Sequence, residues 1–312
     1  MRSKGIIQIV EASGNNYSIG FKVGSVCSDR IKSVLKHNNF SFNASILRLC
    51  KEVFPDIVSE LEGMAVGAGV DFRALFSMNT GLDVGCTTIA FDNAGILLGH
   101  NEDLSENDVF LFKITHESGL RSLSLCYYGF LPGFCVSMNS EGFCQTMNGM
   151  ISKSDGKIGL PNSFLLRKTI ECSNINSAVN IVTSNKTLRG FHVAFYKDKI
   201  VSVESSPKRH IVNEHKVMIH TNHYLFLNDS EARNPIVNSV SRFSQAQTLI
   251  NFFPRSILGI KKILSSHFDK PNSICRHGVN RTAATVLIDL SEKELYLCYG
   301  NPCKGKFKKF YL

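Results

Sequence analysis

The sequence changes character at the stretch Asp83-Val84-Gly85-Cys86-Thr87-Thr88. Before this stretch, apolar residues recur at the spacing of amphipathic helices. After it, short apolar runs separated by turn residues are typical of strands. We therefore expect Cys86 to open a strand-rich body that follows a helical N-terminal part.

The N-terminal part is predicted to consist mostly of helices. Apolar residues at helical spacing predict helices over Ile19 to Leu35 and over Ile46 to Val66. Pro55 should kink or restart the second helix, because proline has no backbone N–H to donate. Asp71 is a suitable N-cap for a short helix that runs through Met78.

The body after Cys86 alternates between groups of strands and groups of helices. Strands are predicted at 86–91, 96–100, 109–115, 121–127, 134–138, 143–147, 191–196, 200–204, 217–221, 283–289 and 295–299. Helices are predicted at 163–171, 175–183, 237–252 and 257–266. This order predicts an α+β fold with two sheets and helices packed outside them, and it disfavours a doubly wound nucleotide-binding fold.

The Gly85-Cys86 step has the composition of a self-cleavage site. Glycine reaches backbone angles that are closed to other residues, which suits a strained peptide bond before a nucleophile. After attack of the Cys86 thiol on the Gly85 carbonyl, hydrolysis would leave Cys86 with a free α-amine, whose ordinary pKa of about 7.7 to 8.0 suits a base. A buried cysteine that starts a strand is the simpler interpretation of this tripeptide alone.

A second polar cluster is Gly99-His100-Asn101-Glu102-Asp103. The predicted turn at 92–95 would bring this strand back beside Cys86, so that Asp103 or Asn101 lies near the new amine. A plain polar strand end is the alternative. A metal site formed by His100, Glu102 and Asp103 is disfavoured, because neighbouring residues of a strand point to opposite faces.

Two asparagines are candidates for stabilising an oxyanion. Asn222 follows an apolar strand in Ile219-His220-Thr221-Asn222-His223-Tyr224, and its amide is suited to donate to a developing negative charge. Asn148 follows the strand at 143–147 and would supply a backbone N–H to the same oxygen. Strand caps are the alternative for both residues. Thr88 is a further candidate for supporting the site.

The run Ser273-Ile274-Cys275-Arg276-His277 has two interpretations: a thiolate favoured by neighbouring cations, or a structural cysteine beside an arginine that pairs with an acid. The chain has ten cysteines, none in a Cys-x-x-Cys pair, and no Cys/His spacing typical of zinc. We therefore expect no metal. Without a signal peptide or a membrane-spanning run, the cytoplasm or another reducing compartment is expected.

The formal net charge is +9, without a basic stripe interleaved with aromatic residues, so nucleic-acid binding is disfavoured. A generally basic, solvated surface explains this charge most simply. A second interpretation is attraction of an anionic substrate such as a coenzyme A thioester. No cofactor is expected.

Together these clusters resemble the acyl-coenzyme A:6-aminopenicillanate acyltransferase family of the N-terminal-nucleophile (Ntn) hydrolase superfamily. The similar segments, in order, are Asn16 to Gly24, Glu60 to Val70, Gly85-Cys86-Thr87, Gly99 to Asp103, His220 to His223, Ser273 to His277 and Gly300-Asn301-Pro302-Cys303. Two departures are Val23, where the family often has histidine, and Leu104, where an aromatic residue is common.

The resemblance implies a four-layer αββα sandwich made as a zymogen. It implies that residues 1–85 are a mostly helical propeptide that stays bound after cleavage, and that residues 86–312 are the catalytic body. Cys86 would be the nucleophile, Asp103 would lie near it, Asn222 would line the oxyanion hole, and Arg276 would belong to the site. The activity would be hydrolysis or transfer of an acyl group from a small amide or thioester.

Two alternatives remain open on the sequence. A papain-like cysteine protease would use Cys86 with a distant histidine and would need no cleavage at Gly85, but the local signature of such enzymes is absent. An uncleaved binding protein with the same fold would keep the motifs without the reaction.

Overall fold

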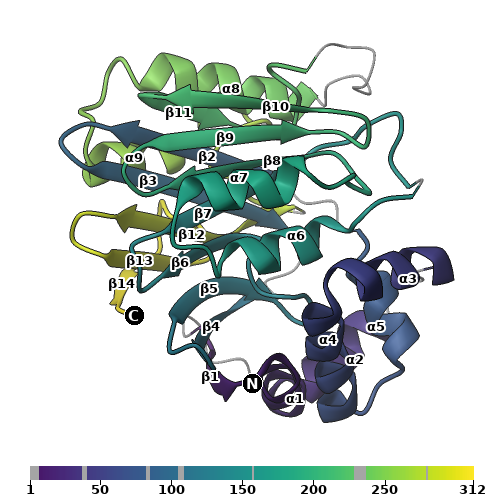
Figure 1. Ribbon diagram of the computed structural model, residues 1–312. Coiled ribbons are helices and arrows are strands. Elements are labelled where there is room, and N and C mark those ends of the chain that lie inside the picture. The colour runs from purple at the N-terminus through teal and green to yellow at the C-terminus, as the bar shows by residue number, and fades with distance from the viewer. Residues whose placement is uncertain are drawn as a thin grey trace.

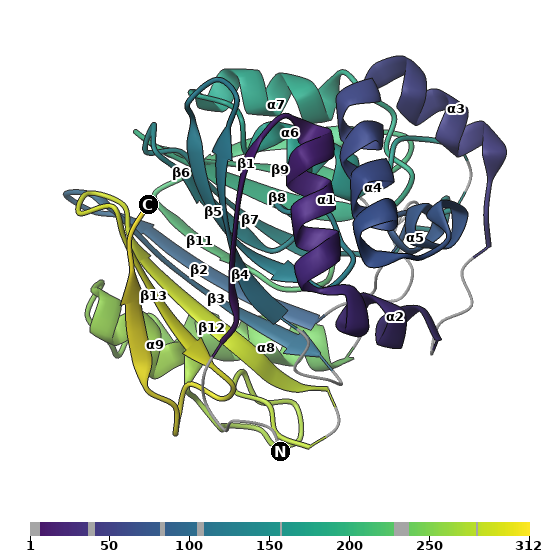
Figure 2. The ribbon, with the colours of Figure 1, turned by 90° about the horizontal axis from the view of Figure 1, so that it is seen from below.

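The computed structural model of the chain describes residues 7–36, 41–81, 85–104, 109–156, 158–227, 237–278 and 280–312, so Asp83 and Val84 lie outside it. Two sheets face each other, and each carries helices on its outer face (Figure 1). Figure 2 shows α8 (Val237–Leu249) and α9 (Ile257–Leu264) against one sheet, and α6 (Asn162–Thr169) and α7 (Ile175–Thr183) against the other. The predicted αββα order of layers is confirmed.

The six-stranded sheet contains Cys86 and is antiparallel throughout. Its strands, in spatial order, are β11 (Val217–His220), β2 (Gly85–Asp92), β3 (Ile96–Leu104), β12 (Arg281–Asp289), β13 (Glu294–Tyr299) and β14 (Phe307–Phe310). Helices α8 and α9 cover the outer face of this sheet, whereas its inner face packs on the other sheet.

The eight-stranded sheet is antiparallel except at one edge, where β1 pairs with β4 in parallel. Its strands, in spatial order, are β1 (Ile9–Gly14), β4 (Val109–His116), β5 (Arg121–Tyr127), β6 (Val136–Asn139), β7 (Cys144–Gly149), β8 (Phe191–Tyr196), β9 (Ile200–Ser205) and β10 (His210–His215). Because β1 precedes the proposed cut, both sides of that cut contribute to one sheet.

The hairpin formed by β2 and β3 places the start of one strand beside the end of the other. Gly85 pairs with Asp103, and Cys86 pairs with Glu102, across the predicted turn at 92–95. Both faces of the hairpin are covered, one by the second sheet and one by helices. This explains why β2 is almost continuously buried instead of alternating between buried and exposed residues.

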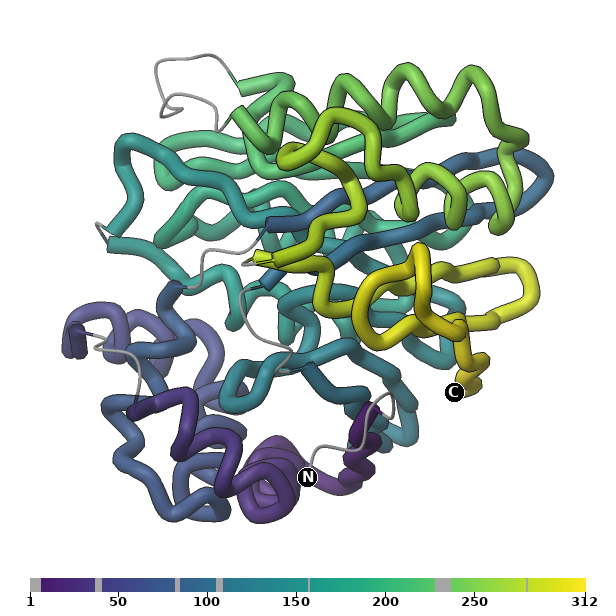
Figure 3. The backbone as a smooth tube through the Cα atoms, turned by 180° about the vertical axis from the view of Figure 1, so that it is seen from behind, coloured from purple at the N-terminus to yellow at the C-terminus, as the bar shows by residue number. Residues whose placement is uncertain are grey.

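Among the described residues, five helices precede β2 where the sequence predicted three helical segments, and they gather at one corner of the sandwich (Figure 3). They are α1 (Asn16–Val26), α2 (Ser28–Lys36), α3 (Ala44–Val53), α4 (Pro55–Ala68) and α5 (Phe72–Met78). Pro55 restarts the chain as the first residue of α4, and Asp71 caps α5 by accepting from Ala74 N at 2.8 Å. The single helix predicted over 19–35 was wrong, because the chain breaks between α1 and α2 at Cys27.

Glycines bring α1 and α4 into backbone contact. A Cβ atom added at Gly20 would lie 1.8 Å from Glu60 O, and one added at Gly63 would lie 2.2 Å from Tyr17 O. Any larger side chain would therefore push the two helices apart. These glycines belong to the two N-terminal segments that resemble the family, so close helix packing accounts for that part of the resemblance.

Asn79, at the end of α5, connects the N-terminal helices to the body. Its amide nitrogen donates to Gly129 O at 2.8 Å, and its amide oxygen accepts from Leu131 N at 2.9 Å. Its backbone carbonyl accepts from the Ser163 hydroxyl at 2.6 Å. A single side chain and its backbone thus bind two segments that follow the proposed cut: the connection between β5 and β6, and α6.

A buried ion pair makes a second connection between the two parts. Arg167 Nε on α6 lies 2.9 and 3.1 Å from the two carboxylate oxygens of Glu60 on α4, and neither side chain is exposed. Breaking a buried pair leaves an uncompensated charge and typically costs about 3–5 kcal/mol. The N-terminal helices are therefore packed into the fold and are not a separate leader.

Three strands were not predicted, and all three lie at sheet edges. β1 pairs in parallel with a strand that lies about a hundred positions away in the sequence, so no local pattern indicates it. β10 and β14 are polar edge strands, and Lys308 and Lys309 on β14 are typical of protected edges. Of the helices that the structure describes, none has the length and apolarity needed to cross a bilayer.

Candidate active site

The Cys86 thiol lies between the two sheets and is fully buried. Its Sγ donates to Glu102 Oε1 at 3.3 Å, on the neighbouring strand. The hydroxyl of Tyr127 on β5 donates to the same oxygen. One carboxylate oxygen therefore accepts hydrogen bonds from both the thiol and the phenol. Nothing in the sequence singles out Glu102 for this position.

A chain of hydrogen bonds continues from Glu102 across the inner face of the hairpin. His100 Nε2 lies 2.7 Å from Glu102 Oε2, and His100 Nδ1 lies 2.8 Å from the Thr88 hydroxyl. Thr88 in turn donates to Asn148 Oδ1 at 2.9 Å. Two residues predicted to support the site, Thr88 and Asn148, are thus joined to the thiol through this chain.

Burial raises the pKa of the Cys86 thiol well above its ordinary value, and the negative charge of Glu102 raises it further. The nearby Arg242 guanidinium acts in the opposite direction but is the weaker influence. The thiol of the intact chain is therefore protonated at neutral pH. A thiolate forms there only when the proton passes to an acceptor, and Glu102 is the acceptor in contact.

The backbone of Cys86 is held from the other face of the hairpin. Its N–H donates to Asn222 Oδ1 at 2.9 Å, and its carbonyl accepts from Arg242 Nη1. Arg242 also donates to Asn222 Oδ1 and to the Thr87 hydroxyl, each at 2.7 Å. Three groups of one residue, namely the thiol, the amide and the carbonyl of Cys86, thus have fixed partners.

Arg242 was not predicted to belong to the site. It lies on α8, and its side chain is almost completely buried, at 1% exposure. Ser239, Arg242 and Ala246 form the inward stripe of this helix at spacings of three and four. Arginine is rarely buried without a partner. An arginine among the apolar, inward positions of a predicted helix is therefore the sequence signal that would have indicated Arg242.

Asp103 lies on the same face of the hairpin as Gly85, opposite to the Cys86 thiol. Its Oδ1 accepts from the Thr282 hydroxyl at 2.8 Å, and its Oδ2 lies 4.0 Å from Arg276 Nη1. Burial raises the pKa of this carboxyl to about 6, although Arg242 and Arg276 both oppose the shift. Within the described residues, Oδ2 has no hydrogen-bond partner, so it is available to a new donor.

Gly85 is required for space and not for unusual backbone angles, which corrects the expectation of strain. It is part of strand β2 and does not have a positive φ. A Cβ atom at this position would lie 3.2 Å from the Asp103 Cβ and 3.3 Å from Arg276 Nη1. Because Gly85 has no side chain, the Asp103 carboxylate and the Arg276 guanidinium can approach the backbone before Cys86.

Asn101 does not contact Cys86. Its amide nitrogen donates to Leu264 O at 2.9 Å and to Ile274 O at 3.2 Å, and its oxygen accepts from the Thr285 hydroxyl at 2.7 Å. It therefore holds the end of α9 and the loop that leads to Arg276. Its contribution to the site is indirect.

A ligand atom from each of Cys86, His100 and Glu102 lies within 4.8 Å of the others, so these residues have the types and positions of a metal site. Asp103, the third ligand considered from the sequence, points to the opposite face. The hydrogen bonds from Cys86 and His100 to Glu102 account for the closeness of the group. We therefore assign the closeness of these residues to hydrogen bonding around the Cys86 thiol and not to a metal.

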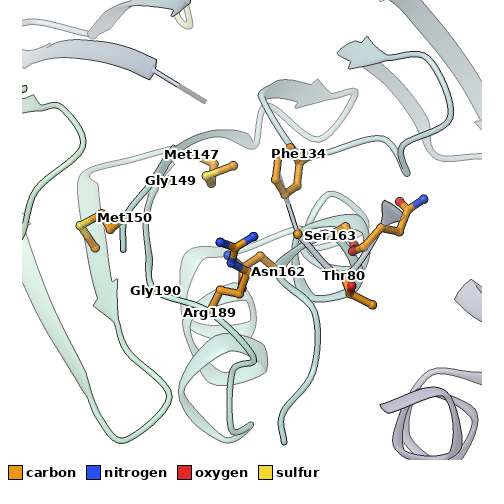
Figure 4. A pocket seen from close by; sticks show the side chains of 11 residues that line it. Thr80, Phe134, Met147, Gly149, Met150, Asn162, Ser163, Arg189 and Gly190 are labelled. Atoms are coloured by element: carbon orange, nitrogen blue, oxygen red, sulfur yellow. The ribbon is translucent and has the colours of Figure 1, made fainter. Parts of the chain in front are cut away.

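A pocket lies beside this group at the ends of the strands. Gly149, which lines it, accepts from Asn222 Nδ2 at 3.0 Å, and Gly81 lines it shortly before the proposed cut. Figure 4 shows Met147 on one side of the pocket and Arg189 on the other. The pocket thus combines apolar and polar walls next to the amide of Asn222.

Comparison with known proteins gives a consistent result. A beta-alanyl-dopamine/carcinine hydrolase of Drosophila melanogaster is 24% identical over 95% of this chain and 93% of its own length. An acyl-coenzyme A:6-aminopenicillanic-acid-acyltransferase (40 kDa form) of Emericella nidulans is 25% identical over 73% of this chain and 69% of its own length. A solved structure of a conjugated bile acid hydrolase variant from Clostridium perfringens has 14% identity and a TM-score of 0.49, and the match covers 73% of this chain and 97% of that one.

The family model for acyl-coenzyme A:6-aminopenicillanic acid acyl-transferases matches residues 91–304, which is more than half of the chain. The match begins after Cys86, so it does not include that residue. It includes the segments that carry Asp103, Asn222, Arg242 and Arg276. The chain belongs to the acyl-coenzyme A:6-aminopenicillanic acid acyl-transferase family.

Proposed function

We propose that this protein is a self-processing cysteine amidohydrolase or acyltransferase of the Ntn type. In this proposal the chain cuts itself between Gly85 and Cys86, and Cys86 then carries the acyl group of a small amide or thioester. The observation that carries the proposal is the separate fixing of the thiol, the amide nitrogen and the carbonyl of Cys86. A structural cysteine needs no such set of partners.

Processing begins with the thiol. Cys86 Sγ attacks the Gly85 carbonyl carbon while its proton passes to Glu102. The Gly85–Cys86 C–N bond breaks, the nitrogen takes up a proton, and a thioester links Gly85 to the Cys86 sulfur. Water then hydrolyses this thioester, which releases the Gly85 carboxylate, the free thiol and a new α-amine. Glu102 returns its proton to the departing nitrogen, and one water molecule is the only reactant consumed.

The new amine replaces Glu102 as the base in turnover. Asn222 Oδ1 already holds the nitrogen that becomes this amine. The unpaired Oδ2 of Asp103 offers a second acceptor beside Gly85, whose departure opens the space between them. The two acceptors would orient the amine so that its lone pair takes the thiol proton.

The acyl-transfer step requires donors for the oxyanion. Asn222 Nδ2 lies at the rim of the pocket, 3.0 Å from Gly149 O. Asn148 Nδ2 is buried and has no hydrogen-bond partner among the described residues, so it supplies a second donor nearby. We propose that these two amides stabilise the tetrahedral species. This differs from the backbone N–H that the sequence suggested for Asn148.

The N-terminal segment is proposed to remain bound after the cut. Strand β1 is paired within the eight-stranded sheet, and Asn79 and the Glu60–Arg167 ion pair connect the segment to the body. Cleavage of a single bond leaves all these contacts in place. The mature enzyme would therefore consist of two pieces held without covalent bonds.

The substrate is proposed to be a small acylated amine, with a coenzyme A thioester as a candidate acyl donor. The relatives named above act on β-alanyl-dopamine and carcinine, or transfer acyl groups to 6-aminopenicillanic acid. No cofactor takes part in this proposal, because the nucleophile, the base and the oxyanion donors all come from the chain.

Trapping of an acyl-enzyme tests the proposed function. Purified protein is incubated with β-alanyl-dopamine, or with an acyl-coenzyme A and 6-aminopenicillanic acid, and is quenched in acid for mass analysis. We expect an acyl adduct on the fragment that begins with Cys86. Turnover by an uncleaved chain would favour a papain-like protease. The absence of both turnover and cleavage would favour a binding protein.

A further inference from the structure

Four potential metal ligands converge at the outer end of the six-stranded sheet. They are His267, just after α9, Cys275 and His277 in the loop before β12, and Cys303 in the turn between β13 and β14. One ligand atom from each residue lies within 4.8 Å of the others. The cluster is separate from the Cys86 group, and three different segments contribute to it.

The distances in this cluster fit a tetrahedral zinc ion. His277 Nε2 lies 3.7 Å from Cys275 Sγ, 3.6 Å from Cys303 Sγ and 3.0 Å from His267 Nε2. Zinc in a regular tetrahedron, with sulfur at about 2.3 Å and nitrogen at about 2.0–2.1 Å, places sulfur and nitrogen about 3.6 Å apart and two nitrogens about 3.3 Å apart. The observed separations differ from these values by a few tenths of an ångström.

We propose that His267, Cys275, His277 and Cys303 bind one structural zinc ion. Two thiolates balance the charge of a divalent ion, and the Cys₂His₂ ligand set is typical of zinc. Asn301 Nδ2 donates to Cys275 Sγ at 3.6 Å, a contact that supports a thiolate. Lys270 and Lys304 lie near the two histidines and would oppose a bare cation, but they also favour thiolates.

The site is reachable from solvent yet anchored inside. His277 is exposed, whereas Cys275 is buried. Cys275 N also donates to Ser266 O at 2.9 Å, which ties the loop to the end of α9. A zinc ion would enter from the exposed side and would be closed in by four protein ligands. Such closed sites serve structure, whereas catalytic zinc keeps an open position.

The ion would fix the position of Arg276, which lies between two of its ligands. Asn301 already donates to Arg276 O at 2.5 Å, and Thr282 N donates to the same oxygen at 3.0 Å. Zinc would lock this loop to the turn that carries Cys303. Arg276 would then be held beside Asp103 without the metal itself approaching Cys86.

No metal was expected from the sequence, because the four ligands are not arranged in a recognisable order along the chain. Cys275 and His277 are neighbours, but His267 and Cys303 join them only through folding. No short spacing motif contains the set. The inference rests on convergence in space.

The metal content of the full-length, reduced protein tests this inference. Protein is treated with a phosphine reductant, dialysed against buffer free of metal, and analysed for zinc by mass spectrometry. A second sample is stripped and loaded with Co²⁺. We expect one zinc per chain, and visible tetrahedral Co²⁺ bands together with thiolate-to-cobalt charge transfer. Reduced wild-type protein that binds neither ion would overturn the proposal.

Three variants locate the ion. Cys303→Ser should lose the zinc and the charge-transfer band. Cys172→Ser, a matched change at a cysteine outside the cluster, should keep both, and so should Cys86→Ala. Zinc that survives Cys303→Ser, or that disappears with Cys86→Ala, would contradict the assignment. If Cys303→Ser does not fold, the cobalt spectrum of Cys86→Ala tests the assignment instead. That spectrum should still show two thiolate ligands on the cobalt ion, and their absence would contradict the assignment.

Discussion

The two faces of the β2–β3 hairpin perform different tasks around one residue. The inner face carries the Cys86 thiol, Glu102 and His100, which touch one another through side chains. The outer face carries Gly85 and Asp103, where α8 and the loop before β12 contact the backbone. In the proposed reaction, the inner face would take up the proton of the thiol, and the outer face would hold the peptide bond to be cut.

This division follows from the two-residue period of a strand. Glu102 and Asp103 are neighbours in the sequence, yet only Glu102 contacts the sulfur. Asp103 instead pairs with Gly85, on the opposite face. A polar motif read along a strand must therefore be divided by face before roles are assigned to its members.

Removal of the thiol should have the largest effect. We expect Cys86→Ala to remain a single chain and to lose turnover by a factor on the order of 10⁵ or more, as hydrolases do without their nucleophile. Electrophoresis and initial rates measure both effects. Cys135→Ala removes another buried thiol close to Glu102 and should still be cleaved. An uncleaved but active Cys86→Ala protein would exclude Cys86 as the nucleophile.

Loss of the inner carboxylate should affect processing more than turnover. Glu102→Gln cannot take up the thiol proton, so cleavage at Gly85 should slow by about 10²–10⁴-fold, the usual contribution of a general base. The rate of appearance of the fragment that starts at Cys86 measures this. Tyr127→Phe removes a competing donor and keeps the carboxylate, so it should be cleaved at close to the normal rate. Equal rates for Glu102→Gln and wild type would remove Glu102 from the reaction.

Asn222 follows β11 and contacts both the Cys86 backbone and the eight-stranded sheet. Asn222→Leu should lower kcat on an amide substrate by about a hundredfold or more and change KM much less. An oxyanion donor acts mainly in the transition state, which explains this split. Because Asn222 also holds the Cys86 N–H, kinetics must be measured on protein that mass analysis shows to be cleaved. Normal kcat in such protein would return Asn222 to a structural role.

The smallest effect concerns stability, at Asp103. Its pKa is raised from 3.8 to about 6 on folding, so its contribution to stability is present below pH 4 and is lost as pH rises through 6. Asp103→Asn avoids the cost of the buried charge. At pH 8 the Asp103→Asn variant should therefore have an unfolding free energy that is up to about 3 kcal/mol higher than that of its parent. This figure is the difference between the pKa values, 6 − 3.8, multiplied by about 1.4 kcal/mol per pKa unit.

Both proteins in this comparison should carry Cys86→Ala, so that the chain stays uncut and unfolding by urea is compared between single chains. The difference should shrink toward zero near pH 4, where the carboxyl is protonated in both the folded and the unfolded state. A difference that does not change between pH 4 and pH 8 would show that Asp103 keeps its ordinary pKa.

The order of elements was predictable because the body alternates between strand and helix patterns that are strong locally. Pro55 and Asp71 placed helix starts correctly, since each acts through its own backbone. What the sequence did not reveal depends on distant partners or on edges: the parallel pairing of β1, and the polar strands β10 and β14.

The residues of the candidate site likewise fall into those that the sequence indicated and those that depend on distant partners. Cys86, Asp103, Asn222 and Arg276 lie in recognisable segments, and the fold brings them together around Gly85. Arg242 was missed, and although its inward position on the helix indicates that it needs a partner, that position does not identify the Cys86 carbonyl that it binds. The role of Glu102 also required the register of the hairpin, which pairs it with Cys86.

Intact mass and N-terminal sequencing of the purified, active protein show whether the chain is cut before Cys86. We expect two polypeptides that separate only on denaturation, one ending at Gly85 and one beginning at Cys86. Active protein in which the Gly85–Cys86 bond is intact would contradict it.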